Sequence, residues 1–501
     1  MILGNKSGLY IFFFLIFFSL YETLYLSILP EFLNIKNINI KWLCYLLVSI
    51  LFLINFFKIG LKGILQQKYI LFYTIFLISY STFNLLNNYE LLDLYFNHIK
   101  ILFGLPTGYQ INIYLISKYF KIISVTLSFC LLFYYINRVT FLEFKKCIFA
   151  FYAIIILSCL IIQIYFYINI LPEINTINQL SIFSDSINRD TAVFKFVGKK
   201  LSIENGALVF DNAIHLRLIG IFKEPSTLAF FSSIIFFLKF ENLFKNRLFI
   251  YFYFFLSVCS AYLFIGTVSL KHAIFYLLVF FVIFFRYKNY LRRDFYFIIL
   301  PFLFVIFIDL LFSTGFVYSF ISKAIYYAIV IYSKIFNIDF NTLIITKNFL
   351  AEQELLDKLG NIAKKDIPIL PENFLNKIDY FGESGLLERI IGNSFLAKNW
   401  SEFYQLFIGN SMIFYHYFLG GVFSILIFYQ LAINLLINNL EVKFKNFYKV
   451  FDLETIAFII LIIFYYLLTK DQLSLDIIVI QCFLIIISTD NNENKLFKKI
   501  K

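Results

Sequence analysis

The sequence predicts an all-α fold: a polytopic integral membrane protein with about twelve transmembrane helices. Three observations lead to this prediction. Hydrophobic residues make up 61% of the 501 positions and charged residues only 15%, which is far from the composition of a water-soluble domain. The apolar residues gather in runs long enough to cross the hydrocarbon core of a bilayer. Basic residues gather in alternate connections between these runs, as they do where connections face the cytoplasm.

The apolar runs follow one another along most of the chain, and each is expected to form one membrane-spanning helix. The first of them lacks a small-residue cleavage site and is long enough to span, so it is expected to be a retained helix rather than a signal peptide. The expected spans are 9–29, 40–57, 69–86, 113–136, 148–171, 226–240, 248–265, 272–286, 295–313, 413–437, 455–470 and 473–488.

The basic connections fix the expected topology. Clusters such as Arg138/Lys145/Lys146 and Arg286/Lys288/Arg292/Arg293 are assigned to the cytoplasm, together with both termini. The net charge of +12 is therefore mostly a topology signal, and nucleic acid is not an expected partner. Two long connections fall on the opposite, outer side. The resulting organisation is 1–171 N-terminal transmembrane bundle, 172–225 first long outer loop, 226–313 central transmembrane helices, 314–412 second long outer loop, 413–488 C-terminal transmembrane helices and 489–501 basic cytoplasmic tail.

The second long loop is expected to be partly helical. Its apolar stretch 316–336 is interrupted by Lys323 and Lys334, so an amphipathic helix at the outer interface is expected there rather than a further span. A second helical stretch is expected at about 385–400, with Leu386 and Ile390 on its apolar face.

Several classes of chemistry have no signature in the chain. The six cysteines lie in or beside apolar spans without a CxxC pair or a Cys/His cluster, so they are expected to act as small hydrophobic residues. Neither a Walker loop nor an HExxH motif occurs, and the outer loops contain no Asp-x-Asp pair. No metal site and no cofactor are expected.

One segment carries chemical information. The sequence Arg217-Leu-Ile-Gly220-Ile-Phe-Lys-Glu224-Pro225-Ser226 runs from the first long loop into an apolar helix. Pro225 is suited to the first helical position, where its missing N–H is no loss, and Glu224 is expected at the junction of loop and helix. The free N–H groups of the helix start then form an anion site to which Arg217 adds a planar donor, and Gly220 lets the backbone fold back closely between them.

This segment, RLIGIFKEPS, resembles the pattern found in Wzy-type O-antigen and capsular polysaccharide polymerases, within the O-antigen polymerase and ligase superfamily. The resemblance rests on Arg217, Gly220, Phe222, Glu224 and Pro225–Ser226, and on the arrangement of spans and long outer loops. It implies a GT-C-like, metal-independent glycosyltransferase in the bacterial cytoplasmic (inner) membrane with its active site on the outer, periplasmic face. The implied reaction transfers a glycan from undecaprenyl diphosphate to another lipid-linked repeat unit in O-antigen, capsule or exopolysaccharide biosynthesis.

The resemblance also nominates site residues. Arg217 is expected to be catalytic and to contact the pyrophosphate, with Gly220 and Ser226 beside it and Arg389 of the second long loop as a second cation. Either Glu224 or His416 would be the base that accepts the proton of the acceptor hydroxyl, and the residues leave that choice open. Implied partners are the undecaprenyl-diphosphate-linked oligosaccharide, membrane lipid and a protein that regulates chain length.

Two other functions remain as alternatives. An O-antigen ligase uses the same donor with a different acceptor, but the His-Asn pair typical of ligases is His416-Tyr417 here, which favours the polymerase. A lipid-linked oligosaccharide flippase or other transporter, which is not an enzyme, would usually place charged residues along a path through the membrane. The spans of this chain are nearly free of charge at their centres, which favours an enzyme with its site in the outer loops.

Overall fold

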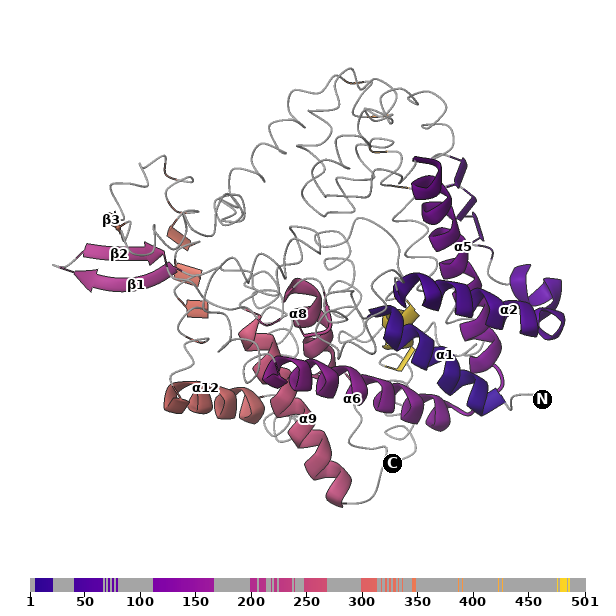
Figure 1. The fold of residues 1–501 in the computed structure, drawn as a ribbon. Coiled ribbons are helices and arrows are strands. Elements are labelled where there is room, and N and C mark those ends of the chain that lie inside the picture. The colour runs from indigo at the N-terminus through magenta and orange to yellow at the C-terminus, as the bar shows by residue number, and fades with distance from the viewer. Residues whose placement is uncertain are drawn as a thin grey trace. The chain divides into compact units, whose positions relative to one another are not determined.

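The computed structural model describes seven α-helices, a 3₁₀ turn, three strands and a few further positions (Figure 1). The described residues are 5–20, 40–65, 111–165, 199–204, 207–212, 218, 220–222, 225–236, 238, 247–267, 299–312, 345–347, 475, 478–483, 485 and 486, with separate positions between 68 and 79 and between 317 and 336, and at 386, 390, 422 and 426.

Helices account for most of the described chain, because long apolar stretches without a proline beyond the first helical turn satisfy their backbone hydrogen bonds internally. They are α1 (Asn5–Leu20), α2 (Ile40–Leu65), α5 (Ile111–Ile136), α6 (Phe141–Tyr165), α8 (Pro225–Ser233), α9 (Arg247–Gly266) and α12 (Leu300–Phe312). The start of α6 is fixed by a capping box. The Thr140 Oγ1 accepts from the Glu143 N–H at 3.3 Å, and the Glu143 carboxylate accepts from the Thr140 N–H at 3.3 Å.

Four of the described helices are long and apolar enough to cross a membrane. They are Leu43–Leu61 within α2, Tyr119–Ile136 within α5, Phe141–Ile164 within α6 and Arg247–Gly266, which is α9. The helical fold class and the association with a membrane are thus confirmed for the apolar segments that the structure describes. The predicted spans 272–286 and 455–470, and the greater part of 69–86 and of 413–437, lie outside the described residues.

The chain divides into two compact units. The first unit contains α1, α2, α5 and the part of α6 up to Phe151. Its helices approach closely through small and hydroxyl side chains, as is common between membrane helices: Ser49 and Ser124 share a hydrogen bond of 3.0 Å. Phe13 on α1 also meets Phe151 on α6, with ring centroids 5.4 Å apart.

The second unit contains α6 from Tyr152 onward, α8, α9, α12 and the strands. Helix α9 packs against both α8 and α12. Phe302 on α12 touches Phe264 on α9 and Phe236 at the end of the 3₁₀ turn, with centroids 5.9 and 5.1 Å apart. This unit holds the segment that the sequence singles out.

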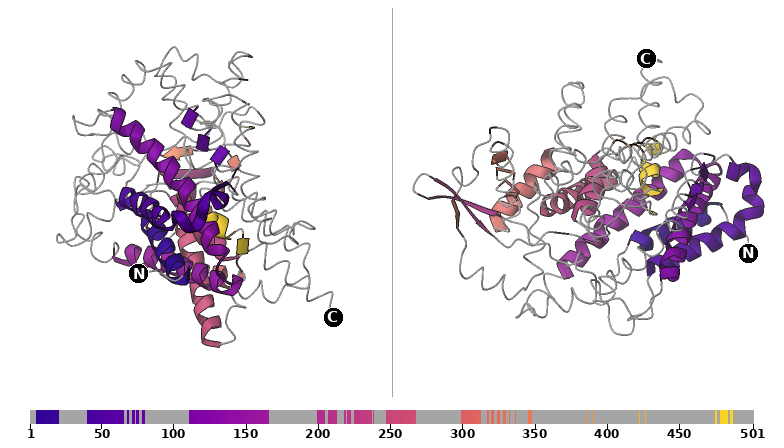
Figure 2. Two further views of the ribbon diagram at one scale, coloured as in Figure 1. Left: turned by 90° about the vertical axis from the view of Figure 1, so that its right-hand side faces the viewer. Right: turned by 90° about the horizontal axis from the view of Figure 1, so that it is seen from above.

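A small three-stranded sheet is the feature of the second unit that composition does not predict. Strands β1 (Lys199–Glu204) and β2 (Ala207–Asn212) form an antiparallel hairpin, and β3 (Ile345–Lys347) pairs in parallel with β2. Figure 1 draws β1 and β2 side by side, and the right-hand view of Figure 2 shows the same two strands running together. Since β1 and β2 belong to the first long loop and β3 to the second, the sheet joins the two long loops of the chain.

One expected span needs a correction. The stretch 226–240 was expected to form a continuous membrane-crossing helix, but α8 has 9 residues and continues only through the 3-residue turn Ile234–Phe236. Leu238 lies outside regular secondary structure. Helix and turn together measure about 19 Å, well short of the roughly 30 Å of a bilayer core.

Candidate active-site segment

The segment between β2 and α8 turns sharply at Gly220. Gly220 has φ +58°, in the left-handed region that favours glycine. A Cβ atom at this position would lie 2.6 Å from Sγ and 2.7 Å from Cβ of Cys159 on α6. Both the conformation and the space therefore require a glycine, as the sequence predicts for a backbone that folds back closely.

Leu218 ties the same segment to the end of α9. Its N–H donates to the carbonyl oxygen of Gly266 at 2.9 Å. The two residues are also in close contact: a side chain on Gly266 would collide with that of Leu218. Leu218 and Ile221 are fully buried, so the segment is part of the interior of the second unit rather than a surface loop.

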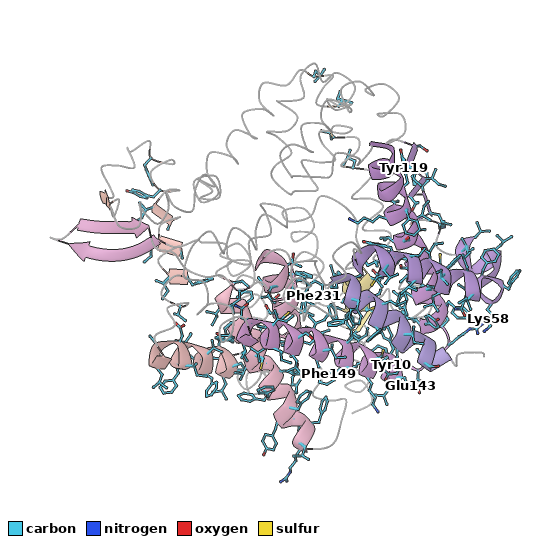
Figure 3. The ribbon with its side chains drawn as sticks, in the orientation of Figure 1. Tyr10, Lys58, Tyr119, Glu143, Phe149 and Phe231 are labelled. Carbon is cyan, nitrogen blue, oxygen red and sulfur yellow. The ribbon has the colours of Figure 1, made fainter. Side chains whose placement is uncertain are left out.

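An aromatic stack then leads the chain into α8. The ring of Phe222 lies nearly parallel to that of Phe231, with centroids 4.9 Å apart and an interplanar angle of 14°; Phe231 is labelled in Figure 3. Phe222 is 3% exposed and Phe231 fully buried. The stack fixes the distance between the turn and the helix body.

Helix α8 begins at Pro225, which confirms the predicted helix start. The first turn of a helix has N–H groups without intrahelical partners, so the segment ends at a set of donors that favours negative charge. From Leu228 to Ser233 the helix is buried on every side. A short helix enclosed in this way is held in one place by its neighbours.

Two of the nominated site residues lie in this described geometry and four do not. Gly220 forms the turn, and Ser226 is the second residue of α8. Arg217 and Glu224 lie outside the described residues, although Arg217 immediately precedes the buried Leu218 and Glu224 immediately precedes Pro225 in the sequence. Arg389 and His416 also lie outside the described residues.

The residues that hold the segment were not nominated from the sequence. Cys159 and Gly266 belong to helices that are distant along the chain, and no local pattern marks either of them. Asp309 is an acidic residue of the apolar helix α12. It is 6% exposed on α12, and its Oδ2 accepts from the N–H of Val317 at 3.0 Å, so one clear role of this carboxylate is to hold the start of the next segment.

In the part of the chain that the structure describes, no group of three or more His, Cys, Asp or Glu residues is placed to hold a metal ion. All six cysteines fall within that part; each is buried with a free thiol.

Comparisons with known proteins add nothing to this geometry: no protein-family model, curated protein or solved structure matches the chain.

Proposed function

We propose that this protein is a membrane glycosyltransferase that polymerises lipid-linked oligosaccharide repeat units at the outer face of the bacterial cytoplasmic membrane. The observation that supports it most is the anchoring of the RLIGIFKEPS segment inside the second unit. The Gly220 turn against Cys159, the Leu218–Gly266 hydrogen bond and the start of α8 at Pro225 fix the backbone directly beside Arg217 and Glu224.

The packing of the segment supports an outward-facing site. Cys159 and Gly266 lie near the carboxyl ends of α6 and α9. Both helices carry basic residues at their amino ends, Lys145 and Lys146 on α6 and Arg247 on α9. Basic helix ends face the cytoplasm, so the carboxyl ends, and the segment with them, would reach the outer side.

The sheet supports the placement of both long loops on one side. Pairing of β2 with β3 places residues 209–211 of the first loop next to residues 345–347 of the second. Arg217 follows the end of β2 at Asn212 by five positions (217 − 212 = 5).

The proposed reaction is a substitution at the anomeric carbon of the donor sugar. An acceptor hydroxyl forms the new glycosidic bond, the bond from the anomeric carbon to the diphosphate breaks, and undecaprenyl diphosphate leaves with the bonding electrons. Arg217 and Arg389 would stabilise the charge that develops on the diphosphate, with the first-turn N–H groups of α8 as additional donors. Glu224 or His416 would take the proton of the acceptor hydroxyl. No metal is needed, since the diphosphate is already a good leaving group.

A gel of surface glycan tests the proposal. A deletion strain is complemented with the wild-type gene, with Arg217→Ala, or with Arg189→Ala as a control from the same long loop. We expect core lipid with a single repeat in the deletion strain and with Arg217→Ala, and a full ladder with wild type and Arg189→Ala. Loss of all capped core, with long lipid-linked polymer accumulating, would identify a ligase instead. An unchanged ladder in the deletion strain would refute both enzyme functions.

A further inference from the structure

Helix α8 ends inside the protein, and tyrosine hydroxyls hydrogen-bond to the carbonyl groups at its end. A helix that stops leaves its last carbonyl groups without intrahelical partners, which is expensive in an apolar interior. The hydroxyl of Tyr152 on α6 donates towards the carbonyl oxygens of Phe231 at 3.1 Å and Ser232 at 3.3 Å. It also shares a hydrogen bond of 3.2 Å with Ser260 on α9.

A second tyrosine hydrogen-bonds to the carbonyl groups of the residues that follow α8. The hydroxyl of Tyr253 on α9 lies 3.1 Å from the carbonyl oxygen of Ile235 and 2.6 Å from that of Leu238. Tyr152 and Tyr253 are both buried. The two hydroxyls therefore hold the carbonyl groups at and just beyond the end of α8. The end of the helix is held by neighbouring side chains, as its beginning is.

One face of α6 contacts both ends of the segment. Tyr152 and Cys159 are seven residues apart in α6 (159 − 152 = 7), which is two helical turns and brings them to the same face. Cys159 supports the turn at Gly220, before α8, whereas Tyr152 holds the carbonyl groups at the end of α8. A movement of α8 along its axis would disturb both contacts together.

We infer that Tyr152 is a positioning residue for the RLIGIFKEPS segment. By holding the end of α8, its hydroxyl keeps Gly220 in contact with Cys159 and keeps the first residue of α8 at a fixed position along the helix axis. The consequence for catalysis rests on the proposed function. Arg217 and Glu224 lie at the two ends of the stretch from 217 to 224 that enters α8, and a catalytic geometry tolerates little displacement. Tyr152 would thus act on the reaction without touching the substrate.

Cys159 provides a reporter that does not depend on activity. The other five cysteines are replaced by alanine (Cys44, Cys130, Cys147, Cys259 and Cys482), and the single-cysteine chain is reconstituted in liposomes. The rate at which a small membrane-permeable maleimide labels Cys159 then reports how firmly Gly220 covers the thiol. We expect labelling to rise about three- to tenfold in Tyr152→Phe, in line with the loss of one buried hydrogen bond.

Kinetics supply the second readout. With the purified lipid-linked repeat unit as substrate, Tyr152→Phe should lower kcat about tenfold per folded molecule and leave KM within about twofold. A purely structural role would reduce the yield of folded protein and leave kcat unchanged. Tyr251→Phe is the matched control, because Tyr251 on α9 is 69% exposed; neither readout should change.

The outcomes separate the two proposals. Faster labelling together with a lower kcat supports the positioning role. Unchanged labelling in Tyr152→Phe overturns it, as does faster labelling with unchanged kcat in an active enzyme. If the wild-type chain makes no polymer but labelling still rises, the positioning of the segment stands and the proposed reaction falls. Should Tyr152→Phe fail to accumulate, Ser260→Ala removes a partner of the Tyr152 hydroxyl and should move both readouts in the same direction by a smaller factor; no change there overturns the role.

Discussion

The aromatic ring of Phe222 lies flat against that of Phe231, with centroids 4.9 Å apart and planes inclined by 14°. Phe222 precedes α8 and Phe231 lies near its end. The contact therefore holds the residues before the helix against a residue near the helix end. The stack thus joins the turn at Gly220 to the body of α8, and its loss should release both.

Phe222→Ala should therefore destabilise the protein and reduce polymer formation together. Truncating a buried phenylalanine costs about 3–5 kcal/mol, and Phe222 is 3% exposed. The measurement is thermal unfolding of the detergent-solubilised protein, with the glycan ladder recorded in parallel. Phe255→Ala on α9, where the side chain is 48% exposed, is the control and should leave the unfolding temperature nearly unchanged. Equal effects of the two substitutions would argue against the stack.

The requirement for glycine at 220 can be tested against a second glycine with a positive φ. Gly60 in α2 has φ +65° and nothing within 4 Å of the position of a Cβ, whereas at Gly220 a Cβ would lie 2.6 Å from the Cys159 thiol. Gly60→Ala should lose about 1–3 kcal/mol, the strain of a residue with a side chain at φ +65° and ψ 167°. Gly220→Ala should lose clearly more stability and abolish the ladder.

The double variant Gly220→Ala/Cys159→Gly isolates the steric part of this effect. It removes the Sγ and Cβ atoms that a Cβ at 220 would meet, so it should recover stability relative to Gly220→Ala but not reach wild type, because the backbone penalty remains. Thermal unfolding of the four proteins in a double-mutant cycle gives the coupling free energy. A coupling near zero would show that the two residues are not in contact.

Part of this site could be predicted from local sequence and part could not. The helix start at Pro225 and the turn at Gly220 depend on the residues' own backbone preferences, so the sequence predicts them. The contact of Gly220 with Cys159 and that of Leu218 with Gly266 depend on how separate helices approach each other, and a single sequence carries no signal of that approach.

The interruption of α8 was missed for a related reason. The apolar run continues through Phe237 and Leu238, so hydropathy gives no reason to end the helix at Phe236. The end depends on hydroxyl groups from Tyr152 and Tyr253 on other helices. The hairpin, in contrast, had a local signal that was not used: Asn205-Gly206, a pair that favours two-residue hairpin connections, separates β1 from β2.

The pairing of β2 with β3 predicts a specific cross-link between the two long loops. Phe210 and Thr346 are register partners, so Phe210→Cys/Thr346→Cys in a cysteine-free background should form a disulfide, provided that the loops face the oxidising outer side. The pair Phe210→Cys/Lys347→Cys is the control, because neighbouring strand residues point to opposite faces. Mass spectrometry of the peptides measures both yields. Equal yields would contradict the register.

Asp309 should matter for stability through its oxygen atoms more than through its charge. Its Oδ2 accepts from the N–H of Val317 at 3.0 Å while the side chain is almost fully buried. Asp309→Ala leaves that N–H without its acceptor and should cost about 1–3 kcal/mol. Asp309→Asn keeps an acceptor oxygen and should lose less. Thermal unfolding distinguishes them, and an alanine variant as stable as the asparagine variant would show that the hydrogen bond contributes little.

Arg217 should behave differently from every residue that holds its segment. The packing of Leu218, Gly220 and Phe222 anchors the backbone, so Arg217→Ala and Arg217→Lys should unfold at the same temperature as wild type. Arg217→Ala should nonetheless abolish the ladder, and Arg217→Lys should restore little of it, because a lysine lacks the planar pair of donors that matches a phosphate. Full activity in Arg217→Lys would mean that position 217 supplies charge alone. A lower unfolding temperature in both variants would instead make Arg217 part of the anchor, and its loss of activity would no longer identify the diphosphate contact.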